Sequence, residues 1–431
     1  AFVDYYFSLR IAQARSTRAR RAYMGTSVSI NLALLAYFKY AFFILDTASW
    51  LAPVSGGLLD ASRRIVLPLG ISFYTFLSIS YTIDVYRRLY DPVRSFRVYL
   101  TYVIFWPHMI AGPILRAHEL IPQLLSRQRW LPGDMAAGIR LVAYGLFLKV
   151  VLADQIAPLV DDAFATDYRK LGGTDVLTMA FAFGFQIYFD FAGYSLVAIG
   201  SARLVGMRFP ENFDWPYLAT TPREFWKRWH ITLSSWIRDY LYLPLMGRAF
   251  KDRSEGGIDI QFVRSGDHAR AFAALFVTWF IMGLWHGASW KFALWGLWHA
   301  AFIAGYRFVQ GRFDRLPAIA VTVGGWGTTL LIAMIGWIPF RATSVEHSLG
   351  LLSRLLDPRG YLSLGFRENF YLVVFAMLVG MLLLRGLSTA ADRWVGRSAA
   401  RDAARVSALA VAVFFVFIFL RPVNQFIYFQ F

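Results

Sequence analysis

The sequence predicts an all-α, polytopic membrane protein from its composition and from the spacing of its apolar residues. Of 431 residues, 57% are hydrophobic and 16% are charged, whereas a soluble domain has roughly 25% charged residues. The mean hydropathy is +0.46. The apolar residues form uninterrupted blocks near the length of a bilayer span, about 20 residues. A transmembrane β-barrel is excluded because its short strands alternate apolar and polar residues.

About ten apolar blocks follow one another, and each predicts a span or a re-entrant segment. In chain order they cover residues 24–45, 65–86, 98–112, 136–160, 176–205, 269–284, 289–310, 318–340, 366–387 and 405–421. A continuous helix over residues 269–304 would measure about 54 Å, more than the roughly 30 Å apolar core of a bilayer. We therefore predict a break in this helix between Gly283 and Gly287.

Four longer polar segments separate these blocks, at residues 115–135, 207–228, 247–270 and 387–404. The third reads as an exposed loop because it contains Glu255-Gly256-Gly257. The stretch from Pro210 to Leu245 is too polar for a plain span and too aromatic for an ordinary loop. It suits the membrane interface or a re-entrant segment that lines a cavity. No internal repeat appears, so an inverted-repeat transporter gains no support, and we predict one membrane domain over residues 1–431.

The net charge of +17 comes from 44 Lys and Arg residues against 27 Asp and Glu residues. The arginines gather between apolar blocks, as in Arg10, Arg15, Arg18, Arg20, Arg21, Arg87, Arg88, Arg94, Arg97, Arg393, Arg397, Arg401 and Arg405. Such loops stay on the cytoplasmic side and meet anionic lipid headgroups. We therefore expect membrane lipids as partners, and no nucleic acid.

The chain has no cysteine, which excludes disulfides, iron–sulfur clusters, cysteine–zinc sites and a thiol nucleophile. It begins at Ala1 without a methionine or a recognisable signal peptide. We therefore expect a processed or truncated start, with hydrophobic segments missing upstream.

His286 is the most informative single residue, since it lies between Trp285 and Trp290 in an apolar stretch. A polar, titratable ring in such a stretch is costly and usually lines a functional cavity. A neutral imidazole there can act as general base on an attacking hydroxyl, while tryptophans exclude competing water. The alternative is a buried histidine that bonds between helices, with Gly283 and Gly287 as a helix-packing motif.

Two further histidines need separate interpretations. His230 follows Trp229 in a charged, aromatic stretch. It is either an interface residue or a group that polarises a carbonyl or orients the acceptor. His299 lies thirteen residues past His286, which is about 20 Å along a continuous helix, so we interpret it as a packing or interface residue.

Asp190 is a carboxylate inside an apolar span. It is expected either to pair with a buried arginine for structural reasons or to support the active-site histidine. His108, in Pro107-His108-Met109, is interpreted as structural.

Several familiar sites are absent from the sequence. His118-Glu119 lacks the second histidine of a zinc-protease helix, so no metal site is predicted. There is no G-x-S-x-G elbow, no P-loop and no dinucleotide fingerprint. What remains is a histidine that acts on an already activated donor.

An ordered series of motifs resembles a known family, the membrane-bound O-acyltransferases. The motifs are Leu67–Phe76, Pro107–Pro113, Phe209–Phe213, Pro216-Tyr217, Glu224–His230, Trp236–Tyr242, Gly283–Gly287 and Phe426–Phe431. The series covers nearly the whole chain and is most like the branch of the bacterial alginate O-acetyltransferase membrane subunit. A single Trp-His pair would be a weak signal, whereas this ordered set is specific.

The resemblance implies a helical bundle around a central funnel that narrows at the key histidine. It implies that His286 is the essential histidine and that His230 is the second functional polar position. Residues of the matching motifs and their surroundings are then expected to bind substrate or support the site: Asn212, Trp229, Trp285, Trp290, Asp190 and Arg238.

The function expected on this basis is acetyl transfer across a bacterial inner membrane. Acetyl-CoA from the cytoplasm is the expected donor, and no bound cofactor is expected. The acceptor is expected to be a hydroxyl on a periplasmic partner protein or an exopolysaccharide, and the residues do not choose among glycans. Two alternatives remain: D-alanyl-type transfer from a carrier protein, and transport of acyl groups or polymer without chemistry.

Overall fold

All regular structure in the described part of the chain is helical, as the sequence predicts. The computed structural model describes every residue except 110–111, 127–130, 248–267, 313–315, 395–398 and 421–431. Most of the predicted loop at 247–270 and the last motif, Phe426–Phe431, lie outside the described residues.

The chain divides into two compact units, each made of three stretches of sequence. Unit 1 comprises Ala1–Gly138, Ala198–Asp214 and Trp226–Ser289, and unit 2 comprises Ile139–Val197, Trp215–Phe225 and Trp290–Phe431. The prediction of one domain over 1–431 stays a prediction, and each unit is described by itself.

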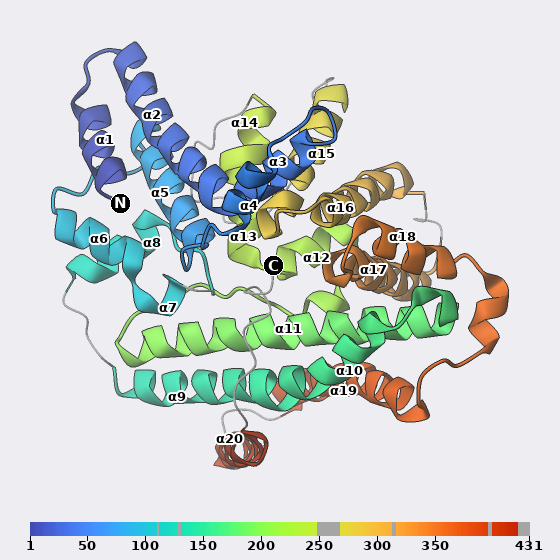
Figure 1. Cartoon of the computed structure of the whole chain (residues 1–431). Coiled ribbons are helices and arrows are strands. Elements are labelled where there is room, and N and C mark those ends of the chain that lie inside the picture. The colour runs from blue at the N-terminus through green and yellow to red at the C-terminus, as the bar shows by residue number, and fades with distance from the viewer. Residues whose placement is uncertain (110–111, 127–130, 248–267, 313–315, 395–398, 421–431) are drawn as a thin grey trace. The chain divides into compact units, whose positions relative to one another are not determined.

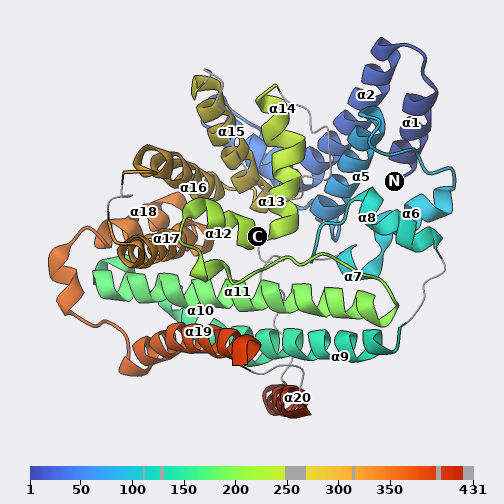
Figure 2. The same ribbon diagram turned by 180° about the vertical axis from the view of Figure 1, so that it is seen from behind.

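Unit 1 is built around three helices that pack on one another, α1, α2 and α5, grouped together in Figure 1 and Figure 2. Its helices are α1 (Phe2–Gln13), α2 (Thr17–Leu35), η1 (Ala36–Tyr40), α3 (Ala41–Ala48), α4 (Gly56–Arg63), α5 (Ile71–Tyr86), α6 (Phe96–Ile104), α7 (Trp106–Met109), α8 (Ala117–Leu125), α13 (Ile231–Ile237), η5 (Arg238–Tyr242), α14 (Leu243–Leu245) and α15 (His268–His286). Helix α5 starts later than the predicted span at residue 65, because Pro68 and Gly70, with φ of +72°, precede it.

Unit 2 contains the helices η2 (Phe147–Ala153), α10 (Asp154–Ala165), η3 (Tyr168–Lys170), η4 (Pro216–Leu218), α16 (Trp290–Val309), α17 (Ala318–Arg341), α18 (Val345–Arg354), η6 (Pro358–Leu362), α19 (Glu368–Trp394) and α20 (Ala399–Phe419). Three more helices contribute residues to both units: α9 (Pro132–Leu146), α11 (Gly173–Leu204) and α12 (Pro222–Arg228).

Six helical segments among the described residues are long and apolar enough to cross a membrane. They are Thr17–Ala48, Pro132–Ala165, Gly173–Leu204, His268–His286, Ala318–Arg341 and Glu368–Thr389. Each overlaps one of the ten predicted blocks. The predicted block at 98–112 is divided instead, because α6 ends at Ile104 and α7 begins at Trp106. The chain is therefore a membrane protein with several spans.

Two glycines allow α9 and α11 to approach closely within unit 2, and Figure 1 and Figure 2 show these helices side by side. A Cβ atom on Gly145 would lie 2.5 Å from the Gly193 carbonyl oxygen, and one on Gly193 would lie 2.7 Å from the Gly145 oxygen. Small residues at such crossings are typical of membrane helices. Lipid is as apolar as the side chains, so the association of helices there depends on close packing, which small residues permit.

Three π-helical turns interrupt the described α-helices, and each carries a charged residue in an apolar surrounding. They are η1 with Lys39, η2 with Lys149, and η5 with Arg238 and Asp239. π turns are rare and occur frequently at functional sites. They mark some of the positions at which this chain places charges among its packed helices, while Asp84 and Asp190 are buried in the α-helices α5 and α11.

The charge in η2 forms a buried ion pair with Asp190 on α11. The Lys149 Nζ atom lies 2.6 Å from Asp190 Oδ1 and 2.7 Å from Asp154 Oδ1. The side chain of Asp190 is 3% exposed, and that of Lys149 is 11% exposed. The partner predicted from the sequence, an arginine, is wrong. The cation is Lys149, because η2 approaches α11 so closely that a Cβ atom on Gly193 would lie 3.1 Å from the Lys149 backbone nitrogen.

We expect Lys149→Met to lower the free energy of unfolding by about 3–5 kcal/mol, because it leaves Asp190 buried without its cation. Thermal unfolding of the purified protein in detergent micelles measures the loss. The matched control is Arg169→Met at an exposed pair, where the side chains of Arg169 and Asp167 are 76% and 45% exposed. That control is expected to leave the melting temperature unchanged. Equal melting temperatures for Lys149→Met and the unmodified chain contradict the buried pair.

Candidate active site

Helix α15 continues through most of the segment where the break was predicted and ends at His286. Residues 287–289 are not helical, and α16 starts at Trp290. Within the break, the Ser289 N–H donates to the Gly287 carbonyl at 2.9 Å. A break between the two helices is confirmed, but it lies at residues 287–289, later than predicted, because α15 stays helical through Gly283–His286. His286 is the last residue of its helix, with 5% of its surface exposed.

The hydrogen bond of His286 fixes which ring nitrogen can accept a proton. His286 Nδ1 lies 2.7 Å from the Met282 carbonyl oxygen, one helical turn earlier. A carbonyl oxygen only accepts hydrogen bonds, so Nδ1 carries the hydrogen. In the neutral ring the lone pair is then on Nε2, which is the form that a general base requires.

The carbonyls that end α15 receive hydrogen bonds from side chains of η1. Lys39 Nζ donates to the Trp285 carbonyl and, at 3.4 Å, to the His286 carbonyl. The Tyr40 hydroxyl donates to the Leu284 carbonyl at 2.9 Å. The last residues of α15 are therefore held by side chains that lie 244 to 247 positions earlier in the sequence.

His230 is held in a strained conformation immediately before α13. Its φ of +43° is in the left-handed region, which costs a non-glycine residue on the order of 1–2 kcal/mol. It is 1% exposed. Strain of this kind persists only where surrounding contacts enforce it, and it is concentrated at functional sites.

Asn212 supplies the contacts that enforce the conformation of His230. Its side-chain oxygen lies 3.0 Å from His230 Nδ1 and accepts from the Thr232 hydroxyl at 2.9 Å and the Thr232 N–H at 3.3 Å. Its backbone carbonyl accepts from the N–H of Ile231 at 2.9 Å. The Thr232 N–H can only donate, so the Asn212 atom that it contacts is the amide oxygen and not the amide nitrogen. An amide oxygen accepts hydrogen bonds, so His230 Nδ1 carries the hydrogen and the lone pair of this ring is also on Nε2.

The two histidines lie within electrostatic range of each other in unit 1. Burial lowers the pKa of His230 well below its usual range, and positive charge on His286 lowers it further. His230 is therefore a neutral ring at physiological pH, able to accept or donate a hydrogen bond without carrying charge.

A stack of three aromatic rings connects the segments that carry the two histidines. The Phe76 ring on α5 stacks on Trp236 of α13 at 3.9 Å and on Trp285 of α15 at 4.8 Å between centroids. Trp236 Nε1 also donates to the Phe76 carbonyl at 3.1 Å. Trp285, predicted as a pocket residue, thus fixes the end of α15 against α5.

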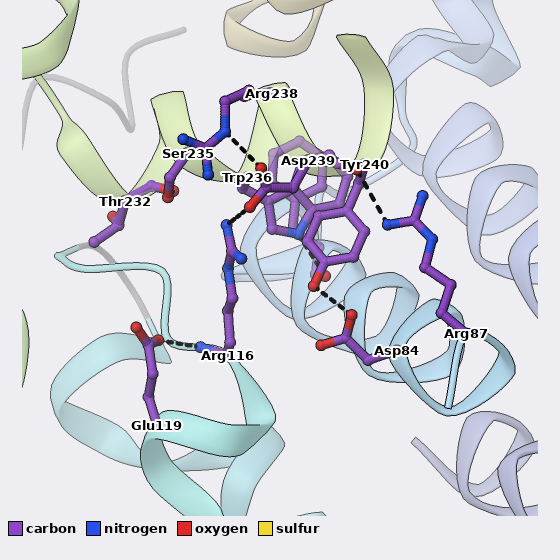
Figure 3. Close-up of polar contacts among 11 residues, drawn as sticks. Asp84, Arg87, Arg116, Glu119, Thr232, Ser235, Trp236, Arg238, Asp239 and Tyr240 are labelled. Atoms are coloured by element: carbon purple, nitrogen blue, oxygen red, sulfur yellow. Dashed lines mark hydrogen bonds and ion pairs between the residues drawn. The ribbon is translucent and has the colours of Figure 1, made fainter. Parts of the chain in front are cut away.

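Directly after α13 in the chain, a network of charges holds η5 in place (Figure 3). The Asp239 carboxylate lies 2.6 Å from Arg116 Nη2 and 2.6 Å from Arg238 Nε, and its backbone carbonyl accepts from Arg87 at 3.2 Å. The Tyr240 hydroxyl donates to Asp84 on α5 at 2.8 Å. Arg238, predicted as a site residue, belongs to this supporting network.

The other predicted residues are placed as follows. Trp229 is 1% exposed, and its ring meets Phe213 edge-on at 5.1 Å, beside His230. Asp190 and Trp290 belong to unit 2, where Asp190 pairs with Lys149 and Trp290 is the 36%-exposed first residue of α16. His299, also in unit 2, is 3% exposed and stacks on Phe225 at 6.4 Å, which fits its predicted packing role.

Two groups at this site were not predicted from the sequence. Lys39 lies in the predicted span at 24–45, and a charge there was an available signal. The pairing of Arg116 with Asp239 had no sequence signal. Asp239 lies in the motif Trp236–Tyr242, whereas Arg116 lies far from it in the sequence and in none of the motifs. Among the described residues, no group of three or more metal-ligating side chains gathers.

Comparison with known proteins identifies the family. The model described as MBOAT, membrane-bound O-acyltransferase family, matches residues 91–257. The chain is 38% identical over 344 residues to a probable alginate O-acetylase AlgI of Azotobacter vinelandii, which covers 80% of this chain and 64% of that protein. It is 29% identical over 385 residues to a peptidoglycan O-acetyltransferase of Helicobacter pylori, covering 83% and 69%. It is 28% identical over 254 residues to a teichoic acid D-alanyltransferase of Streptococcus thermophilus, covering 56% and 57%.

The chain spans less than two thirds of the length of the alginate O-acetylase that it matches. The match nevertheless extends over most of this chain, beyond the region that the family model covers. On this similarity, and on the ordered motifs around His230 and His286, the chain belongs to the membrane-bound O-acyltransferase family.

Proposed function

We propose that the chain is an O-acetyltransferase of a bacterial inner membrane. It takes acetyl from acetyl-CoA on the cytoplasmic side and passes it to a hydroxyl on the other side. His286 is the general base, and His230 assists it. The observation that carries this proposal is the bond from His286 Nδ1 to the Met282 carbonyl, which leaves Nε2 as the proton acceptor at a helix break.

The reaction needs no metal or nucleotide hydrolysis, because the thioester is already activated. The acceptor oxygen attacks the thioester carbonyl while its proton moves to His286 Nε2. A C–O bond forms, the C–S bond breaks, and the proton passes from His286 to the departing coenzyme A sulfur. His230, neutral and held by Asn212, assists the acceptor hydroxyl or the carbonyl oxygen through its own ring.

The proposed acceptor is a serine of a periplasmic partner protein or an exopolysaccharide hydroxyl. Relatives named for alginate and for peptidoglycan O-acetylation support an extracytoplasmic glycan as the final product. The Trp285 and Trp229 rings beside the two histidines support a site that excludes competing water. Arg238 is proposed to act through the network that holds η5, and the supporting roles of Trp290 and Asp190 stay predictions.

A second candidate differs in the donor. A relative is named as a teichoic acid D-alanyltransferase, so transfer from a carrier protein is the alternative. Labelled acetyl-CoA offered to the purified chain in nanodiscs, with periplasmic extract as acceptor, separates the two. Label transfer is expected under our proposal. If donor binding and label transfer require an added acidic carrier protein, free acetyl-CoA is not the donor. If polymer crosses the membrane while the donor stays intact, the chain is not an acyltransferase.

We expect His286→Gln to lower acetyl transfer by about 100- to 10,000-fold, because the hydroxyl then loses its proton acceptor. Initial rates with labelled acetyl-CoA measure the change. The matched control is His299→Gln, which alters another buried histidine that follows a tryptophan. The control is expected to retain turnover per folded molecule. Normal turnover in folded His286→Gln would contradict its role as base.

We expect Asn212→Leu to lower kcat by about 10- to 100-fold, because His230 loses the acceptor that orients its ring. Asn31→Leu is the control, since Asn31 is another buried asparagine of unit 1 and bonds to Asp4. In a His230→Ala background, Asn212→Leu should cost little more. Additive losses in the double variant would show that Asn212 does not act through His230.

A further inference from the structure

The backbone carbonyls of the last turn of α15 need hydrogen-bond donors from outside the helix. The carbonyls of the last four residues of any α-helix have no partner inside the helix. Here these residues are Gly283, Leu284, Trp285 and His286, and the chain leaves the helix immediately afterwards. Three of these four carbonyls accept hydrogen bonds from Lys39 and Tyr40. Two neighbouring side chains therefore cap the helix that carries the proposed base.

Lys39 has no acidic partner in the described part of the chain, although it lies in a candidate span, Thr17–Ala48. Its other contacts include the Ser72 hydroxyl at 3.5 Å and the faces of Trp285 and Tyr40, 5.7 Å and 6.0 Å from the ring centroids. A cation at a helix C-terminus is stabilised by the partial negative charge of the aligned carbonyls. The end of α15 therefore serves as the counter-charge for Lys39.

The π turn η1 places both donors at the same end of α15. Successive side chains on an α-helix point about 100° apart, so neighbours seldom contact the same target. Lys39 and Tyr40 are the last two residues of η1, and both reach consecutive carbonyls of α15. The π turn thus coincides with the place where two neighbouring side chains, Lys39 and Tyr40, both bond to the C-terminal end of α15.

The orientation of His286 depends on that last turn. The bond from Nδ1 to the Met282 carbonyl joins residues four positions apart, so it persists only while residues 282–286 stay helical. We propose that Lys39 and Tyr40 are positioning residues: they keep the last turn of α15 helical and thereby hold His286 Nε2 toward the reacting hydroxyl. This inference rests on the proposed role of His286 as base.

The chain offers a matched control for a lysine that only stabilises a helix end. Lys291 of unit 2 donates to the Phe340 carbonyl at 3.3 Å and to the Ala342 carbonyl at 2.6 Å, at the end of α17. Both lysines are half-buried and cap a helix C-terminus. Only Lys39 caps a helix that ends in a proposed catalytic residue.

The test compares Lys39→Met, Tyr40→Phe, Lys39→Arg and Lys291→Met in the full chain, in lipid nanodiscs with labelled acetyl-CoA. We expect Lys39→Met to lower kcat by about 10- to 100-fold with an unchanged KM for acetyl-CoA, since misplacement of the base affects the chemical step. Tyr40→Phe lowers kcat less, and Lys39→Arg restores part of the rate. Lys291→Met retains kcat, even where its melting temperature falls as far as that of Lys39→Met.

A second measurement does not depend on turnover. Hydrogen–deuterium exchange of the amides of residues 283–286 is expected to accelerate in Lys39→Met and to stay unchanged in Lys291→Met. Unchanged exchange there, or equal kcat losses in the two lysine variants, would overturn the proposal. If the unmodified chain fails to turn over acetyl-CoA while exchange still accelerates in Lys39→Met, the proposed donor is wrong and the capping of α15 stands.

Discussion

The hydrogen bond between His286 Nδ1 and the Met282 carbonyl is the interaction on which the proposed chemistry depends. It fixes the tautomer, but it requires a helical turn at the point where α15 stops. A helix end in an apolar environment needs donors for its carbonyls, because no water is available there. Unit 1 supplies these donors from η1 and fixes Trp285 through the ring stack on Phe76.

Three π turns place charged side chains among packed helices, where Lys149 and Asp239 are buried and Lys39 is half-buried. Lys39, Lys149 and Asp239 all lie in π turns, and each is compensated differently. Lys39 donates to helix carbonyls, Lys149 forms ion pairs with carboxylates, and Asp239 forms ion pairs with arginines. A charge among packed helices is tolerated only with partners. In each of these π turns, the local departure from α-helical geometry coincides with the contacts that the charged side chain makes.

The features of the chain that local pattern determines could be predicted from its sequence. The helical fold follows from apolar block length, and the break beside His286 follows from the excess length of residues 269–304. Local pattern does not determine which distant residue satisfies a polar group. Lys39 and the Trp285 carbonyl are 246 positions apart, and the lysine that pairs with Asp190 was expected to be an arginine. The motif containing Asn212 was recognised, whereas its bond to His230 depends on a left-handed backbone that no motif encodes.

The most direct test of the central claim is the tautomer of His286. Solid-state nitrogen-15 NMR of histidine-labelled protein in lipid resolves protonated from unprotonated ring nitrogens, and the His286→Gln variant identifies the signals of that residue by difference. Our account predicts that the lost signals belong to a ring with hydrogen on Nδ1 and a lone pair on Nε2. Signals from a ring with hydrogen on Nε2 and a lone pair on Nδ1 would contradict it, because the proposed proton acceptor would already be occupied.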